Sequence, residues 1–167
     1  MTKAWTFELH GREDRVTIRL VEFIERLSHA DDATDKHYGL FIWPSAMVLA
    51  RFVAFHHERL FRGATVMELG CGTALPEANI ALNDVQATAS FLPLDWGSLD
   101  LVERVNELAQ VDIILAADCF YQSKDFESVL ATVAIVFRCN PDARFFTTYQ
   151  LRRYRFPFLR TQREYTR

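Results

Sequence analysis

Residues 65–74 read Thr-Val-Met-Glu-Leu-Gly-Cys-Gly-Thr-Ala. An apolar strand leads through Glu68 into a turn that carries two glycines, Gly70 and Gly72. This order is typical of Rossmann-type α/β folds, because glycine lets the backbone turn tightly and approach a ligand closely. The third glycine of the dinucleotide fingerprint G-x-G-x-x-G is replaced by Leu75. The turn therefore predicts a nucleotide-like cofactor and argues against the dinucleotide of an NAD-dependent oxidoreductase.

The chain has 167 residues, the size of about one domain, and half of them are hydrophobic. Its charge is uneven. Residues 1–150 carry 13 Lys and Arg against 21 Asp and Glu, whereas residues 151–167 carry six Arg against one Glu. We predict a single acidic domain over 1–150 and a basic tail over 151–167. The tail is expected to be a solvated end, and we expect no direct contact with nucleic acid because no aromatic stacking platform accompanies the arginines.

The three cysteines lack C-x-x-C spacing, which indicates free thiols in a reducing compartment. The N-terminus has no apolar signal region, and no apolar run is long enough to span a bilayer. We therefore expect a cytoplasmic and nuclear location and no membrane contact. The pair His56-His57 predicts no metal site, because adjacent helical positions do not face one ligand.

Strand and helix patterns alternate along the chain. An apolar run at 111–117 predicts a strand buried on both faces, and a clear helix follows at 126–138. The remaining predictions are a hairpin of strands 5–9 and 16–21, helices at 46–60, 76–82 and 99–109, and strands at 66–69, 87–94 and 144–149. Such alternation indicates an α/β fold with a mainly parallel sheet.

Ligands of parallel sheets bind beyond the carboxyl ends of the strands. Three of these predicted ends carry notable residues, namely Glu68 to Gly72, Asp95-Trp96 and Ala117-Asp118, and Trp43 precedes the helix that comes before the first strand. Two tryptophans could enclose an adenine, and carboxylates could face an amino group, a ribose or a sulfonium. These groups favour S-adenosylmethionine as the cofactor.

Four motifs together resemble family 16 of the class I methyltransferases. They are Tyr38-Gly39-x-x-x-Trp43-Pro44-Ser45, Glu68-Leu69-Gly70-Cys71-Gly72-Thr73, Leu94-Asp95-Trp96-Gly97 and Ala117-Asp118-Cys119-Phe120-Tyr121. The resemblance covers residues 5–150 and implies a Rossmann-like class I methyltransferase sheet with an N-terminal β-hairpin. It also implies an S-adenosylmethionine pocket formed by Trp43, Glu68, Gly70, Cys71, Gly72, Trp96 and Ala117, and an acceptor site formed by Asp118 and Tyr121.

The resemblance further implies a protein substrate. Family members methylate protein side chains, mostly lysine, and one is regarded as a histone arginine methyltransferase, so a histone or a chaperone-like protein is the expected partner. Structural roles remain open for the single residues. Trp43 and Tyr121 could pack in the core, Trp96 could cover the end of a strand, Cys71 could serve packing, and Asp118 could cap a helix.

The chain departs from the family between Gly72 and Asp95, which are only 23 positions apart. Two helix-strand units and a further strand would need about 40 residues. We therefore expect that one strand-helix unit is absent, with the junction after Pro76, and that the closing C-terminal strand pair is absent too, as in a truncated or alternatively spliced product. The alternative function is a catalytically inactive chain that acts as a protein-binding module.

Overall fold

The computed structural model describes residues 2–10, 13, 15–21, 42–72, 76–98, 100–108 and 110–150. The predicted basic tail and the Tyr38-Gly39 part of the first motif lie outside these residues.

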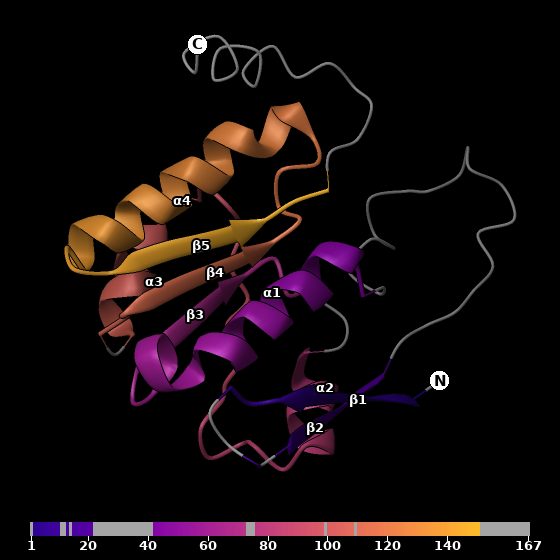
Figure 1. Cartoon of the computed structure of the whole chain (residues 1–167). Helices are drawn as coiled ribbons and strands as arrows, with labels where there is room; N and C mark the ends of the chain where they lie inside the picture. Colours follow the sequence, from indigo (N-terminus) through magenta and orange to yellow (C-terminus); the bar gives the residue numbers. More distant parts are fainter. Residues whose placement is uncertain are drawn as a thin grey trace, which may run out of the picture.

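Three parallel strands form the central sheet of the described chain. They are β3 (Val66–Leu69), β4 (Ile113–Ala117) and β5 (Arg144–Thr148), in the order β3-β4-β5. Val66 pairs with Ile113, which pairs in turn with Arg144. Because the three strands are parallel, their carboxyl ends meet at one edge of the sheet (Figure 1). This edge is where the sequence predicts the functional residues.

Helices cover both faces of this sheet. The helices α3 (Leu101–Glu107) and α4 (Phe126–Cys139) contact each other on one face, and α1 (Pro44–His56) lies across the other face, against β4 and β5 (Figure 1). The short helix η2 (His57–Phe61) extends α1. The short helix η3 (Ser123–Asp125) directly precedes α4. The core joins the sheet to α3 and α4, and its most buried members include Leu101, Ile114, Val129, Thr132 and Val136.

The N-terminal hairpin forms a second, two-stranded sheet. Its strands β1 (Thr2–Glu8) and β2 (Arg15–Val21) are antiparallel, as the sequence predicts. The helix α2 (Pro76–Leu82) packs against β2. The side-chain amides of Asn79 and Asn83 accept hydrogen bonds from the backbone N–H groups of Val21 and Arg19, each at 2.8 Å. The helix that follows the glycine turn is therefore attached to the hairpin.

The α/β class and the hairpin are confirmed, but the strand expected at 87–94 is wrong. That segment consists of turns and irregular backbone, and Thr88 and Ala89 both donate their N–H groups to the carbonyl of Val85. The segment begins with small residues that offer little apolar surface, and Pro93 cannot donate to a strand ladder. In the described part of the chain, therefore, no strand lies between β3 and β4, in line with the short span after Gly72.

Within the same residues, no helix is both long and apolar enough to cross a membrane, and no group of three or more potential metal ligands gathers.

Candidate functional site

The glycine turn begins directly at the carboxyl end of β3. Gly70 and Gly72 have φ angles of +77° and +80°, in the left-handed region that side chains disfavour. A Cβ atom on Gly70 would lie 2.6 Å from Cys119 Sγ and 3.3 Å from Cζ2 of Trp96. Position 70 therefore requires glycine for both its conformation and its surroundings.

Cys119 and Trp96 approach the turn from two other segments. The Cys119 thiol is buried and donates to the carbonyl of Leu69 at 3.3 Å, while the half-buried indole of Trp96 packs against the same core cluster. The turn, the residue after Asp118 and the Leu94-Asp95-Trp96-Gly97 motif thus meet at one point. The alternative that Trp96 covers a strand end agrees with this contact, because Gly70 directly follows β3, although no strand forms immediately before Trp96 itself.

The surroundings of the turn disfavour negative charge. The Glu68 side chain keeps contact with solvent, yet the protein atoms around it displace enough water to raise the pKa of its carboxyl group. Desolvation and, second, the charge of Glu68 raise the pKa of the exposed Cys71 thiol. Burial, followed by the charge of Glu68, raises the pKa of Cys119 to about 12. A cationic group placed beside Glu68 would favour its charged form.

Asp118 follows β4 directly, after Ala117, the half-buried last residue of the strand. Asp118 is buried and has a φ angle of +56°. Its backbone N–H donates to the carbonyl of Thr148 at 2.7 Å, and its carboxylate accepts from the N–H of Gln150 at 3.3 Å. The alternative that Asp118 caps a helix is wrong, because the next helical turn, η3, begins after Gln122.

Trp43 lies directly before α1, whose first turn contacts this region. The half-buried Trp43 precedes the helix, and its carbonyl accepts from the N–H of Ala46 at 3.0 Å. Two residues later, the carbonyl of buried Ser45 accepts from the hydroxyl of Thr148 at 2.8 Å. Since Thr148 also bonds Asp118, the start of α1 is tied to the ends of β4 and β5.

The structure therefore brings the predicted residues together in two groups. Gly70 and Trp96 meet over Cys119, whereas Asp118 is linked through Thr148 to Ser45, two residues after Trp43. The next residue after Asp118 in sequence is Cys119, so the two groups are adjacent. The sandwich of Trp43 and Trp96 around an adenine, and an acceptor role for the half-buried Tyr121, stay predictions.

Cys119 and Thr148 were missed as supporting residues. Both belong to the carboxyl ends of strands, and that position in the sequence is the signal that could have identified them.

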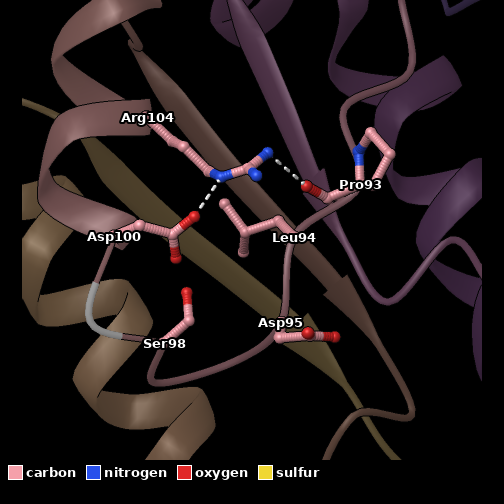
Figure 2. A pocket seen from close by; sticks show the side chains of 6 residues that line it. All are labelled: Pro93, Leu94, Asp95, Ser98, Asp100 and Arg104. Atoms are coloured by element: carbon pink, nitrogen blue, oxygen red, sulfur yellow. Dashed lines mark hydrogen bonds and ion pairs between the residues drawn. The ribbon is translucent and has the colours of Figure 1, made fainter.

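A small cavity lies beside the Leu94-Asp95 segment that precedes Trp96. Its volume is about 140 Å³, and Pro93, Leu94, Asp95, Ser98, Asp100 and Arg104 line it. The Arg104 guanidinium crosses it, donating to Asp100 at 2.5 Å and to the Pro93 carbonyl at 2.9 Å (Figure 2). The hydrogen bond from Arg104 lowers the pKa of Asp100. Because ligand pockets usually exceed about 300 Å³, this cavity could take only a fragment of a cofactor.

Comparison with known proteins identifies one family. The sequence profile described as lysine methyltransferase matches residues 74–160, just over half of the chain. The match covers α2 through β5 and continues ten residues beyond position 150, so the domain boundary at 150 stays a prediction.

Curated relatives extend the match toward the N-terminus. The histone-arginine methyltransferase METTL23 of Xenopus laevis is 31% identical over 175 residues, covering 84% of this chain and 73% of the relative. The human protein of the same name is 32% identical, and its alignment covers 68% of this chain and 71% of the human protein. The rat protein is 34% identical, and the chain spans only 61% of its length. These relatives confirm the resemblance to methyltransferase-like protein 23 that residues 124–132 and 147–150 suggest.

The alignment with the frog relative also shows that this chain is shorter. The alignment has 175 positions, but it includes only 84% of the 167 residues of this chain, which is about 140. About 35 aligned positions of the relative therefore have no counterpart in this chain. A gap of about 35 positions is long enough to contain a strand-helix unit, although its position after Pro76 stays a prediction. With more than half of its length matched by the profile and most of it aligned with such relatives, the chain belongs to the lysine methyltransferase family, a family of protein methyltransferases.

Proposed function

We propose that this chain transfers a methyl group from S-adenosylmethionine to a nitrogen atom of a protein side chain. One observation supports this most directly: the glycine turn, Trp96 and the Asp118-Cys119 segment converge at the carboxyl edge of a parallel sheet, in a member of a methyltransferase family. In sheets of this kind, that edge is where ligands bind.

The residues around the turn fit the amino acid end of the cofactor. Glu68 is a solvent-accessible carboxyl whose charged form is disfavoured where it stands, so the cofactor's ammonium group would offset that cost. The backbone of Gly70, Cys71 and Gly72 would follow the amino acid portion, with Trp43, Trp96 and Ala117 around the rest. The cofactor supplies an electrophilic methyl group, and the protein's task is alignment of donor and acceptor.

Asp118 is the proposed acceptor residue. Its backbone N–H donates a hydrogen bond to the Thr148 carbonyl, and its carboxylate accepts one from the N–H of Gln150. These two hydrogen bonds hold the Asp118 side chain in one orientation. A carboxylate fixed in this way would orient the incoming nitrogen and attract its positive charge. Tyr121 would shape the channel through which the acceptor enters.

The proposed substrate is a basic protein such as a histone. Residues 1–150 carry eight more acidic than basic side chains (21 against 13), and a surface of that sign attracts a basic partner. Four relatives are named histone-arginine methyltransferases, whereas a mouse relative that is 30% identical is named a protein-lysine methyltransferase. We place arginine first as the acceptor, and we propose a cytoplasmic and nuclear location, where such substrates occur.

Calorimetric titration with S-adenosylhomocysteine tests the proposal. We expect one site with micromolar affinity, and a dissociation constant about tenfold higher in Glu68→Gln, because a charge-assisted hydrogen bond is lost. Glu103→Gln, which changes an exposed residue of α3, is the matched control and should bind like the natural chain. A folded, monodisperse chain that binds no cofactor would overturn the proposal.

A second function is favoured by the missing positions. A chain that lacks about 35 aligned positions of its relative could keep the family's surface helices without the cofactor site, and act as a protein-binding module. Binding to a histone tail peptide without cofactor binding would support this function. Transfer of a labelled methyl group to that peptide would refute it.

A further inference from the structure

Thr132 is a polar residue at a position that suits an apolar one. It lies in the middle of α4, fully buried, among the core residues Val129, Val133 and Val136. Valine has nearly the same shape and would avoid the cost of removing a hydroxyl group from water. The hydroxyl therefore needs a structural use that offsets this cost.

Both hydrogen-bonding capacities of this hydroxyl are used. It donates to the carbonyl of Ser128, one helical turn earlier, at 2.8 Å. It also accepts the backbone N–H of Gly97 at 3.0 Å, across 35 positions of sequence. The first bond stays within the helix, as is common for threonine, whereas the second attaches a distant turn to α4.

The attached turn lies directly against the helix. Gly97 has a φ angle of +73°, and a Cβ atom there would lie 3.2 Å from the Cβ and Oγ atoms of Ser128. The N–H of Ser98 donates to the carbonyl of Asp95 at 3.2 Å and closes the turn. Two bonds and one close backbone approach thus fix the turn that carries Trp96.

The position of this turn decides where the Trp96 indole lies. That ring packs over Gly70, with Cζ2 at 3.3 Å from the position of a Cβ atom. We propose that Thr132 is a positioning residue, whose hydroxyl holds the Trp96-Gly97 turn on α4 and thereby keeps the indole against the glycine turn. This inference rests on the proposed function, since it concerns the same cofactor site.

Two substitutions separate the hydroxyl from the packing of the side chain. Thr132→Val keeps the volume and removes the acceptor of the Gly97 N–H, whereas Thr132→Ser keeps the hydroxyl and removes a methyl group. We expect the dissociation constant for S-adenosylhomocysteine to rise about tenfold in the valine variant and to change less than about threefold in the serine variant. A role in packing alone predicts the opposite order.

A second readout does not depend on cofactor binding. With Trp5 and Trp43 replaced by phenylalanine, Trp96 is the single fluorophore of its kind. We expect acrylamide to quench its emission more strongly in Thr132→Val than in the parent. In Thr132→Ser, quenching should be the same as in the parent. Thr88→Val is the matched control, because it also removes a hydroxyl that donates to a backbone carbonyl, here that of Val85 in an exposed loop.

The two readouts also separate this inference from the proposed function. If the natural chain binds no cofactor, the proposed function fails, and the quenching experiment still decides the role of Thr132. A folded Thr132→Val variant with unchanged quenching overturns the inference, and so does a Thr132→Ser variant that is quenched as strongly as Thr132→Val.

Discussion

The contact between Gly70 and Cys119 leads to a prediction about a single residue. Gly70→Ala places a methyl group at a φ angle of +77° and 2.6 Å from the Cys119 sulfur. We expect the free energy of unfolding to fall by about 2–4 kcal/mol, because backbone strain and a core clash add to each other. Urea unfolding followed by circular dichroism measures the change.

Gly63 provides the matched control for this substitution. Its φ angle is +70°, and nothing lies within 4 Å of the position that its Cβ would take. Gly63→Ala should therefore lose only the conformational part, about 1–2 kcal/mol. Equal losses at positions 63 and 70 would show that the contact with Cys119 does not contribute.

Single residues were predictable where the chain order itself carries the information. Gly70 and Asp118 follow strands and Glu68 is the next-to-last residue of one, and the carboxyl ends of parallel strands must meet at one edge of the sheet. The supporting contacts could not be predicted in this way. The bond between Thr132 and Gly97 joins positions 35 apart, and nothing in the local pattern of α4 distinguishes that threonine from a core valine.

At the scale of an element, the attachment of α2 to the hairpin is open to test. Asn83 accepts from the N–H of Arg19 and donates to its carbonyl at 2.6 Å, so it replaces a neighbouring strand at the edge of β2. We expect Asn83→Ala to lower the free energy of unfolding by about 1–2 kcal/mol, since the two hydrogen bonds to Arg19 and one to the Asn79 carbonyl are lost. Hydrogen exchange of the Arg19 amide should become faster.

Asn106→Ala in α3 is the control, because it also shortens an asparagine side chain to that of alanine. Asn106 is exposed, and its side chain accepts a weak bond from the Cys139 thiol as its one side-chain bond to another described residue. This variant should leave stability and Arg19 exchange nearly unchanged. If Asn83→Ala behaved in the same way, the amide bonds to β2 would not hold the hairpin.

Elements with a strong pattern were predicted well. The continuous apolar run of β4 indicates a strand buried on both faces. The apolar stripe of α4 repeats with the period of a helix, so both elements could be predicted. The strand expected at 87–94 failed because its alternation is carried partly by alanine, which buries too little surface to favour a strand. The docking of α2 on β2 depends on two side-chain amides, and periodicity does not register such contacts.

At the scale of the whole molecule, the sheet order has a consequence for association. On the side of β3 away from β4, no strand pairs with it in the described part of the chain. An open strand edge offers unpaired N–H and C=O groups to another chain. We expect the purified protein to self-associate reversibly at micromolar concentrations, as measured by sedimentation velocity over a range of protein concentrations.

Val66→Lys should shift this equilibrium toward the monomer, because a lysine on an edge strand opposes further pairing. Val102→Lys is the matched control: the two valines are 42% and 43% exposed, but Val102 lies on α3. Association that is equal in both variants, or a natural chain that stays monomeric, would contradict a role for the β3 edge.

Val66 begins β3 and Gly70 follows its end, about 13 Å further along at 3.3 Å per residue. The monomeric variant should therefore still bind S-adenosylhomocysteine. That result would show that self-association through the β3 edge and cofactor binding are independent properties.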